Sequence, residues 1–380
     1  MNQVLMFLTT FIIQFIIATE MNLISPLAPF LSEYFNIKDS SVILFNFGYS
    51  LVGVLVPYLG ILADKYGKKR ILSLSLLLFI CGSIIAGISK SPILFAFGRI
   101  FIGLGYFSLS GTNLSYISDF ITYENRGKAS GVLRAAFGLA ILTSPIYATI
   151  LINRFGNLYS IYLPLIILGI IAFILLFRLP ETKKSANIKI NKNEFIDILK
   201  DPNGSKVFLS LFLIITAPSM LLNFLGIHLS NNFNLNQSQI GLTYSTIAIG
   251  TVLGILIAAL LSDRIGKLRL SKLLFLVMVL AQIPIPYLNS LYIVICLAVL
   301  FALGLDGGWT AYQTFSSEIK PEKRGTFMSL FYTVNAVTVT FYSVVGSLVY
   351  NFGGFKIAVG LGTVFSGLAL FIIHRIKLTE

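Results

Sequence analysis

The feature that most constrains this chain is a series of apolar runs, each long enough to cross a lipid bilayer. A spanning helix needs about 20 mostly apolar residues. Only 11% of the residues are charged and 56% are hydrophobic, whereas soluble domains carry about 25% charged residues. We therefore expect an all-α polytopic membrane protein with twelve transmembrane helices. The predicted spans are 4–27, 41–63, 71–89, 92–117, 129–151, 159–178, 206–228, 239–262, 271–288, 290–315, 325–349 and 356–374.

Basic residues indicate the orientation of these spans. Most of the 28 lysines and arginines fall in loops on one side, which the positive-inside rule assigns to the cytoplasm. Both termini are then cytoplasmic, and the first span is a retained helix. The formal charge of +13 is explained by topology, so we expect no nucleic-acid partner. Cys81 and Cys296 lie in apolar runs, and we expect them to be buried and unpaired.

The chain repeats itself. GILADKYGKKR at 60–70 returns as ALLSDRIGKLR at 259–269, and the Arg-Gly pair at 126–127 returns at 324–325. Two motifs at almost the same offset indicate duplication, a common origin of transporters, whose sites lie between the repeats. The predicted pseudo-symmetric halves are a six-helix bundle over 1–180 and another over 206–380, joined by a cytoplasmic linker over 181–205.

These motifs resemble those of the major facilitator superfamily over essentially the whole chain. GILADKYGKKR is similar to its signature loop between helices two and three, and Arg99 in GRIFIGLG to its helix-four arginine. TEMNLISPLAPFL at 19–31, with Glu20 at the acidic position, resembles helix one of the drug:proton antiporter branch. In place of the helix-five Gly-Pro-x-x-Gly-Gly motif of many antiporters, the sequence reads SPIYA at 144–148.

The loop motifs suggest a latch between conformations. The Asp64 carboxylate can face the positive N-terminus of another helix, which by resemblance is helix eleven. Glycines would permit close contact at 60 and a tight turn at 67, and nearby bases could pair with acids at the end of helix four. The alternative is that the basic residues only set topology. The predicted latch residues are Gly60, Asp64, Gly67, Lys68, Arg70, Asp119, Glu124, Arg126, Asp263, Arg264, Gly266 and Arg324.

Three charged residues within spans are the strongest site candidates. An acid or base in the bilayer is costly unless it faces a partner or a cavity, so it indicates function. Glu20 and Arg99 lie at depths compatible with a pair, and Glu20 is the predicted proton site. The alternative for them is a static ion pair. Asp306, in a glycine-rich part of span ten, is a second candidate for coupling or substrate binding, or else a polar packing contact.

Other residues are weaker candidates for a polar path through the protein. They are Gln14, Asn113, Arg134, Asn223, Trp309, Tyr312 and Asn335. The sequence has no P-loop, metal-ligand spacing or catalytic triad, so we expect no enzyme activity, metal or cofactor beyond a proton gradient. The expected partners are a small-molecule substrate, protons and membrane lipid.

The predicted function is secondary active transport by alternating access, as a monomer in the plasma membrane. A mostly apolar path favours proton-coupled efflux of a lipophilic or amphipathic compound. The alternatives are proton-coupled uptake of a small organic anion, with Arg99 and Arg134 binding its carboxylate, and a non-transporting receptor or scaffold on the same fold.

Overall fold

The computed structural model describes residues 3–121, 126–182 and 192–376, and helices dominate these ranges, which contain no strand. Proline and 3-10 turns divide some of the N-terminal spans into shorter pieces. The elements of this half are α1 (Gln3–Met21), α2 (Ala28–Tyr34), η1 (Asp39–Leu44), α3 (Phe45–Leu51), η2 (Val52–Leu55), α4 (Val56–Tyr66), α5 (Lys68–Ile88), α6 (Pro92–Ser118), α7 (Arg126–Phe155) and α8 (Leu158–Phe177).

The C-terminal half follows a short linker helix, α9 (Lys192–Lys200). Its elements are α10 (Pro202–Ile214), α11 (Thr216–Phe233), α12 (Gln237–Ile265), α13 (Lys267–Gln282), η4 (Ile285–Tyr287), α14 (Leu291–Ser316), η5 (Pro321–Lys323) and α15 (Arg324–His374).

The described residues contain eleven helical segments that are long and apolar enough to cross a membrane. The last of them, Pro321–His374, has 54 residues, more than twice the length of one span. Gly354 interrupts it with φ 64° and ψ −161°, which are not helical. Two spans therefore meet at Gly354, and the twelve predicted spans are confirmed.

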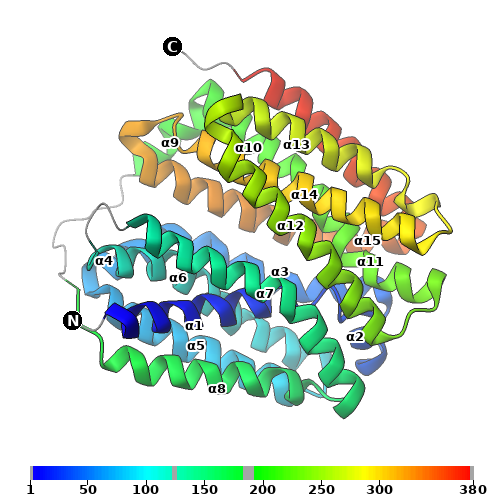
Figure 1. The fold of residues 1–380 in the computed structure, drawn as a ribbon, viewed down its shortest axis with the longest axis horizontal. Coiled ribbons are helices and arrows are strands. Elements are labelled where there is room, and N and C mark those ends of the chain that lie inside the picture. The colour runs from blue at the N-terminus through cyan, green and yellow to red at the C-terminus, as the bar shows by residue number, and fades with distance from the viewer. Residues whose placement is uncertain (1–2, 122–125, 183–191, 377–380) are drawn as a thin grey trace.

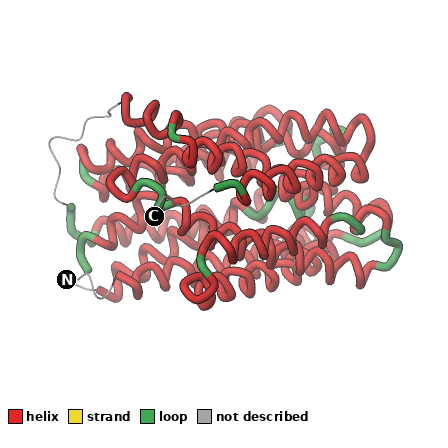
Figure 2. Tube along the Cα trace, turned by 90° about the horizontal axis from the view of Figure 1, so that it is seen from above, coloured by secondary structure: helices red, strands yellow, loops and turns green. Residues whose placement is uncertain are grey.

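The helices run along the long axis of the molecule in two bundles (Figures 1 and 2). In Figure 1 the N-terminal half occupies the lower part and the C-terminal half the upper part. The halves meet where α7 packs against α12, and where η1 and α3 pack against α15. We call the end that holds α9 the linker end, and the opposite end, which holds α2, the far end.

The first span differs from its prediction. The helix ends at Met21, and turns over 22–27 precede α2, whereas we expect one helix over 4–27. Asn22 Nδ2 donates to the carbonyl of Ala18 at 2.7 Å and so caps the last turn of α1. Pro26 has no N–H to continue the helical bonding pattern.

The sequence repeat is also a structural repeat. Gly67 ends α4 at φ 100° and ψ 131°, and Gly266 ends α12 at φ 92° and ψ 128°. A positive φ disfavours residues with a Cβ, so glycine is required at both turns. Lys68 pairs with Asp119 at 2.6 Å, and in the other half Lys267 pairs with Glu318 at 2.5 Å. Each pair ties the turn to the end of a helix 51 residues later.

One sequence expectation about packing is wrong, and another stays a prediction. In this conformation a Cβ added at Gly60 would meet no atom within 4 Å, and the close contact predicted there belongs to a conformation closed at the linker end. Cys81 and Cys296 are exposed rather than buried, because their sides of the helices face away from the bundle. The glycines of α14 do allow close approach: a Cβ at Gly304 would lie 2.5 Å from the carbonyl oxygen of Leu274.

Ion pairs attach the end of the linker to the C-terminal half. Asp201 accepts hydrogen bonds from the amides of Asn203 and Gly204 and so caps α10. It also pairs with Lys320 at 2.9 Å, and Asp197 pairs with Lys323 at 3.6 Å. Burial alone would raise the pKa of Asp201, but Lys320 and the two amides outweigh it and hold that pKa below its usual value of 3.8.

Candidate functional site

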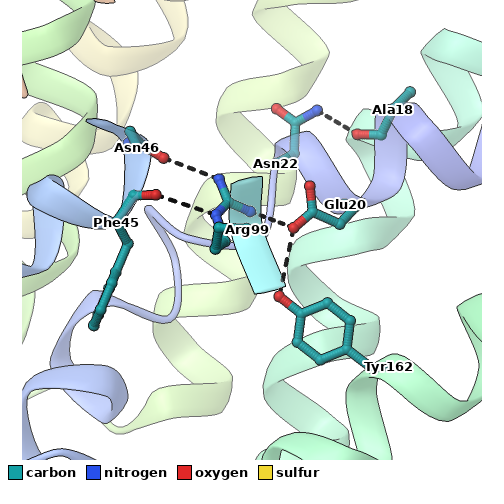
Figure 3. Close-up of polar contacts among 7 residues, drawn as sticks. All are labelled: Ala18, Glu20, Asn22, Phe45, Asn46, Arg99 and Tyr162. Carbon is teal, nitrogen blue, oxygen red and sulfur yellow. Dashed lines mark hydrogen bonds and ion pairs between the residues drawn. The ribbon is translucent and has the colours of Figure 1, made fainter. Parts of the chain in front are cut away.

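A buried ion pair lies inside the N-terminal half. Glu20 comes from the last turn of α1 and Arg99 from the second turn of α6. Arg99 Nη1 donates to Glu20 Oε1 (Figure 3). The Glu20 side chain is 0% exposed and that of Arg99 is 1% exposed. A buried pair has little net effect on stability, but losing one partner leaves an uncompensated charge.

The other two guanidinium nitrogens of Arg99 also donate to the protein. Nε donates to the carbonyl of Phe45 at 3.3 Å, and Nη2 donates to Asn46 Oδ1 at 3.1 Å. The guanidinium carbon also lies 4.4 Å from the centre of the Tyr49 ring, a favourable cation–π geometry. In this conformation Arg99 is therefore fixed by its own half and by Glu20.

Only one of the two oxygens of the Glu20 carboxylate has a hydrogen-bond partner among the described residues. Oε1 accepts from Arg99 and, at 3.4 Å, from Tyr162 OH on α8. Oε2 is buried and has no hydrogen-bond partner among the described residues. A buried, unpartnered carboxylate oxygen is costly, and a proton bound to it would remove the charge. The geometry therefore suits reversible protonation.

A second set of polar residues lies between the halves. Asp306 on α14 accepts a hydrogen bond from Thr251 on α12 at 2.7 Å. Arg134, an exposed residue on α7 of the other half, interacts electrostatically with Asp306 and with Tyr332 on α15. Gln313 donates to Tyr332 OH. Asp306 is thus not part of the Glu20–Arg99 pair, and its charged neighbour comes from the opposite bundle.

The other predicted path residues are scattered. Asn113 is buried, and its Nδ2 donates to the carbonyl of Thr10 at 2.9 Å, which joins α6 to α1. Tyr312 is fully buried and bonds Ser210 at 2.6 Å inside the C-terminal half. Trp309 packs against a phenylalanine ring of α15. Gln14 and Asn335 are half-buried.

Asn223 lies at a contact between the halves near the far end. Its Oδ1 accepts from Ser25 Oγ at 2.9 Å and from Asn46 Nδ2 at 3.5 Å. Ser50 and Thr340 form another cross-half bond at 2.8 Å, and Gln237 Nε2 donates to the carbonyl of Pro26 at 2.6 Å. These bonds join the two bundles near the Glu20–Arg99 pair.

Within the described ranges the predicted latch residues form no ion pair between the two halves. Asp64 is half-buried and Arg70, Asp263 and Arg264 are exposed; of these, only Asp263 forms an ion pair within the described ranges, at 3.8 Å with Lys267. Arg324 donates to the carbonyl of Ser317 at 2.9 Å.

Two predicted latch residues lie at a gap between the described ranges. Glu124 lies outside the described residues, and Arg126 is the first residue of α7. The contact of Asp64 with helix eleven stays a prediction for a conformation closed at the linker end.

An apolar cavity of about 360 Å³, open to the protein surface, lies between the second span and α15. Thr340 supplies the polar side chain in its lining. The other lining residues are Phe47, Leu51, Val337, Phe341, Val344 and Val345. The cavity lies beside the cross-half bond of Ser50 and Thr340, where the two bundles meet.

Sequence reasoning gave no site role to Tyr162 or Thr251, although each bonds a predicted acid. Tyr162 lies in the most apolar of the helices, and Thr251 is one of several threonines in α12. A single hydroxyl in an apolar span is common and carries no distinctive pattern. Only the fold shows which acid each hydroxyl meets.

Comparison with known proteins gives a consistent family. A family model described as the Major Facilitator Superfamily matches residues 10–206 and 207–379. The uncharacterized MFS-type transporter YwfA of Bacillus subtilis is 26% identical over 367 residues, covering 91% of this chain and 85% of that one. The riboflavin transporter RibZ of Clostridioides difficile is 25% identical, covering 85% and 84%. An uncharacterized transporter of Buchnera aphidicola is 31% identical over half of each chain.

Solved structures agree on the fold. A nucleoside transporter, NupG, superposes with a TM-score of 0.79 at 14% identity, covering 98% of each chain. A D-xylose–proton symporter superposes with the same score and identity, covering 98% of this chain and 97% of its own. At these identities the likeness concerns the fold alone.

Proposed function

The chain belongs to the Major Facilitator Superfamily, and from that premise we propose that it exports a lipophilic or amphipathic compound in exchange for protons. It would act as a monomer in the cell membrane, with both termini cytoplasmic and the linker end facing the cytoplasm. The halves would rock around a site between them, as is common for transporters built from repeats.

The observation that carries the proposal is the half-satisfied carboxylate of Glu20. Oε2 has no partner within the described ranges, while Oε1 is held by Arg99. A carboxyl group in a span can take up and release a proton as the site faces either side of the membrane. The D-xylose–proton symporter that shares this fold supports proton coupling as part of the proposal.

Two features favour an amphipathic substrate. The cavity between the second span and α15 has an almost wholly apolar lining. Asp306 and Arg134 bring charges of opposite sign from the two halves, and a substrate with a polar group could meet them. In this reading Asp306 and Arg134 contact the substrate and Glu20 carries the proton.

Uptake of a small organic anion is the second candidate, because Arg134 is exposed. Arg99 contributes little to it, since each of its three guanidinium nitrogens already donates to the protein: to Glu20, to Asn46 or to the Phe45 carbonyl. That function would therefore depend on Arg134.

The test is substrate-triggered proton movement in proteoliposomes, screened with lipophilic cations and small carboxylates. We expect a lipophilic compound to trigger flux in the wild type and not in Glu20→Gln. Flux triggered by carboxylates and lost in Arg134→Gln would support anion uptake instead. Flux unchanged in Glu20→Gln would remove Glu20 from coupling and refute the proposed mechanism.

A further inference from the structure

Asn46 occupies an unusual position, between the buried ion pair and the other half of the protein. Its Oδ1 accepts from Arg99 Nη2 at 3.1 Å (Figure 3), and its Nδ2 points to Asn223 Oδ1 at 3.5 Å. Asn223 belongs to α11 of the C-terminal half. One side chain therefore contacts both the ion pair and the opposite bundle.

The direction of these hydrogen bonds follows from chemistry. A guanidinium group can only donate, so Arg99 must bind the oxygen of the Asn46 amide. The amide nitrogen is thereby turned toward Asn223. Asn223 is oriented to receive it, because its own Nδ2 donates to the carbonyl of Ser219 at 3.0 Å. The position of Arg99 therefore decides whether Asn46 can donate across the interface.

The charge of Glu20 in turn decides the position of Arg99. The groups facing Glu20 are Arg99 and three tyrosines, Tyr49, Tyr106 and Tyr162. Tyrosine stays neutral in the physiological range. The helix α7 also packs against α1, but its Tyr147 donates to the carbonyl of Ile161 instead of to Glu20. Arg99 is therefore the only described group whose charge balances Glu20.

We propose that Asn46 and Asn223 are positioning residues that link the Glu20–Arg99 pair to closure of the far end. Protonation of Glu20 removes the charge that holds Arg99. The guanidinium then moves from the Asn46 oxygen, the amide loses its orientation, and the bond to Asn223 breaks. The halves separate more readily at the far end when Glu20 is protonated. This inference rests on the proposed function, because it takes Glu20 as the proton-binding residue.

Two cross-half bonds provide matched controls. Ser25 donates to the same Asn223 oxygen at 2.9 Å but does not contact Arg99. Ser50 and Thr340 bond across the halves at 2.8 Å without contacting the ion pair. Removing either bond should weaken closure equally at all pH values. Removing Asn46 should instead remove the dependence of closure on pH.

The experiment measures the distance between the halves at the far end, without substrate. Spin labels at Lys38 and Asn232, which are exposed on opposite halves, report the open and closed populations in nanodiscs. The background carries Cys81→Ser and Cys296→Ser, because both native thiols are exposed and would react.

In this background we expect the open-to-closed ratio to rise at least about fivefold between about pH 9 and about pH 5, a usual size for coupling between sites. Glu20→Gln, Asn46→Ala and Asn223→Ala should each reduce that change to less than about twofold. Ser25→Ala and Thr340→Val should shift the ratio but keep its fivefold response.

A full pH response in folded Asn46→Ala or Asn223→Ala would overturn the proposal, as would loss of the response in Thr340→Val. If Glu20→Gln keeps the response, the coupling does not start at Glu20 and the proposal also fails. The outcome is separable from the transport test: a response that requires Asn46 in a protein without proton flux would support the link and refute coupled transport.

Discussion

Replacing Arg99 by leucine should be one of the most costly single changes in the N-terminal half. Both members of the pair are almost fully buried. Arg99→Leu leaves the carboxylate of Glu20 without a counter-charge and the Asn46 oxygen without its donor. Removing one partner of a buried pair costs about 3–5 kcal/mol, so we expect a loss of that size in the free energy of unfolding.

The assay is reversible unfolding in mixed detergent micelles, with Glu20→Leu/Arg99→Leu as the matched control. Apolar replacement of a whole buried pair is often neutral, so the double variant should recover most of the lost stability. Acidification should also recover part of the loss in Arg99→Leu, since a protonated Glu20 carries no charge. A double variant as unstable as the single one, or an Arg99→Leu protein within about 1 kcal/mol of the wild type, would refute the reasoning.

Two further predictions concern the linker end. Gly67→Ala should lower the free energy of unfolding by about 1–2 kcal/mol because φ is 100° there. The control is Gly60→Ala, whose new methyl would meet no atom within 4 Å and which should leave the free energy of unfolding unchanged or raise it by up to about 1 kcal/mol. Equal losses in the two variants would contradict the strain argument. The pKa of Asp201 is lowered in the fold, so its stabilising effect is complete above its usual value of 3.8 and disappears as the pH falls through the lower folded-state value. Amide hydrogen exchange at the start of α10, corrected for intrinsic rates, should therefore accelerate in that acid range in the wild type. Asp201→Asn should show no such acceleration. The same acceleration in both proteins would show that the pair with Lys320 does not hold α10.

The sequence predicts the spans and the family because both depend on local patterns. A bilayer requires long apolar runs, and the repeated loop fixes glycine and charge at set spacings. The glycine-rich part of span ten is visible in the sequence, and in the structure its Gly304 lies against the backbone of α13. Helix ends within a span, such as the end of α1 at Met21, are harder to predict, because a capping asparagine and a proline can also occur inside membrane helices.

The connections of the site could not be predicted in the same way. A sequence shows that Glu20, Arg99 and Asp306 are charges within spans, but not which hydroxyl or amide each will meet. Asn46 becomes informative only when the fold brings α3 between α6 and α11. The sequence does not show which way its side-chain amide is turned, and in the structure Arg99 binds the amide oxygen.

The attachments of the linker restrict how far the bundles can travel. On one side Lys68 N donates to Thr182 Oγ1 at 2.9 Å, which fastens the chain to the N-terminal half. On the other, Asp197 and Asp201 fasten α9 and α10 to residues beside α15. The segment from Thr182 to Lys192 joins these two attachments, and covalent geometry limits its end-to-end length to about 35 Å. The length of this segment sets an upper limit on how far the two bundles can separate at the linker end. Deletions in it should therefore reduce that separation while both bundles fold unchanged.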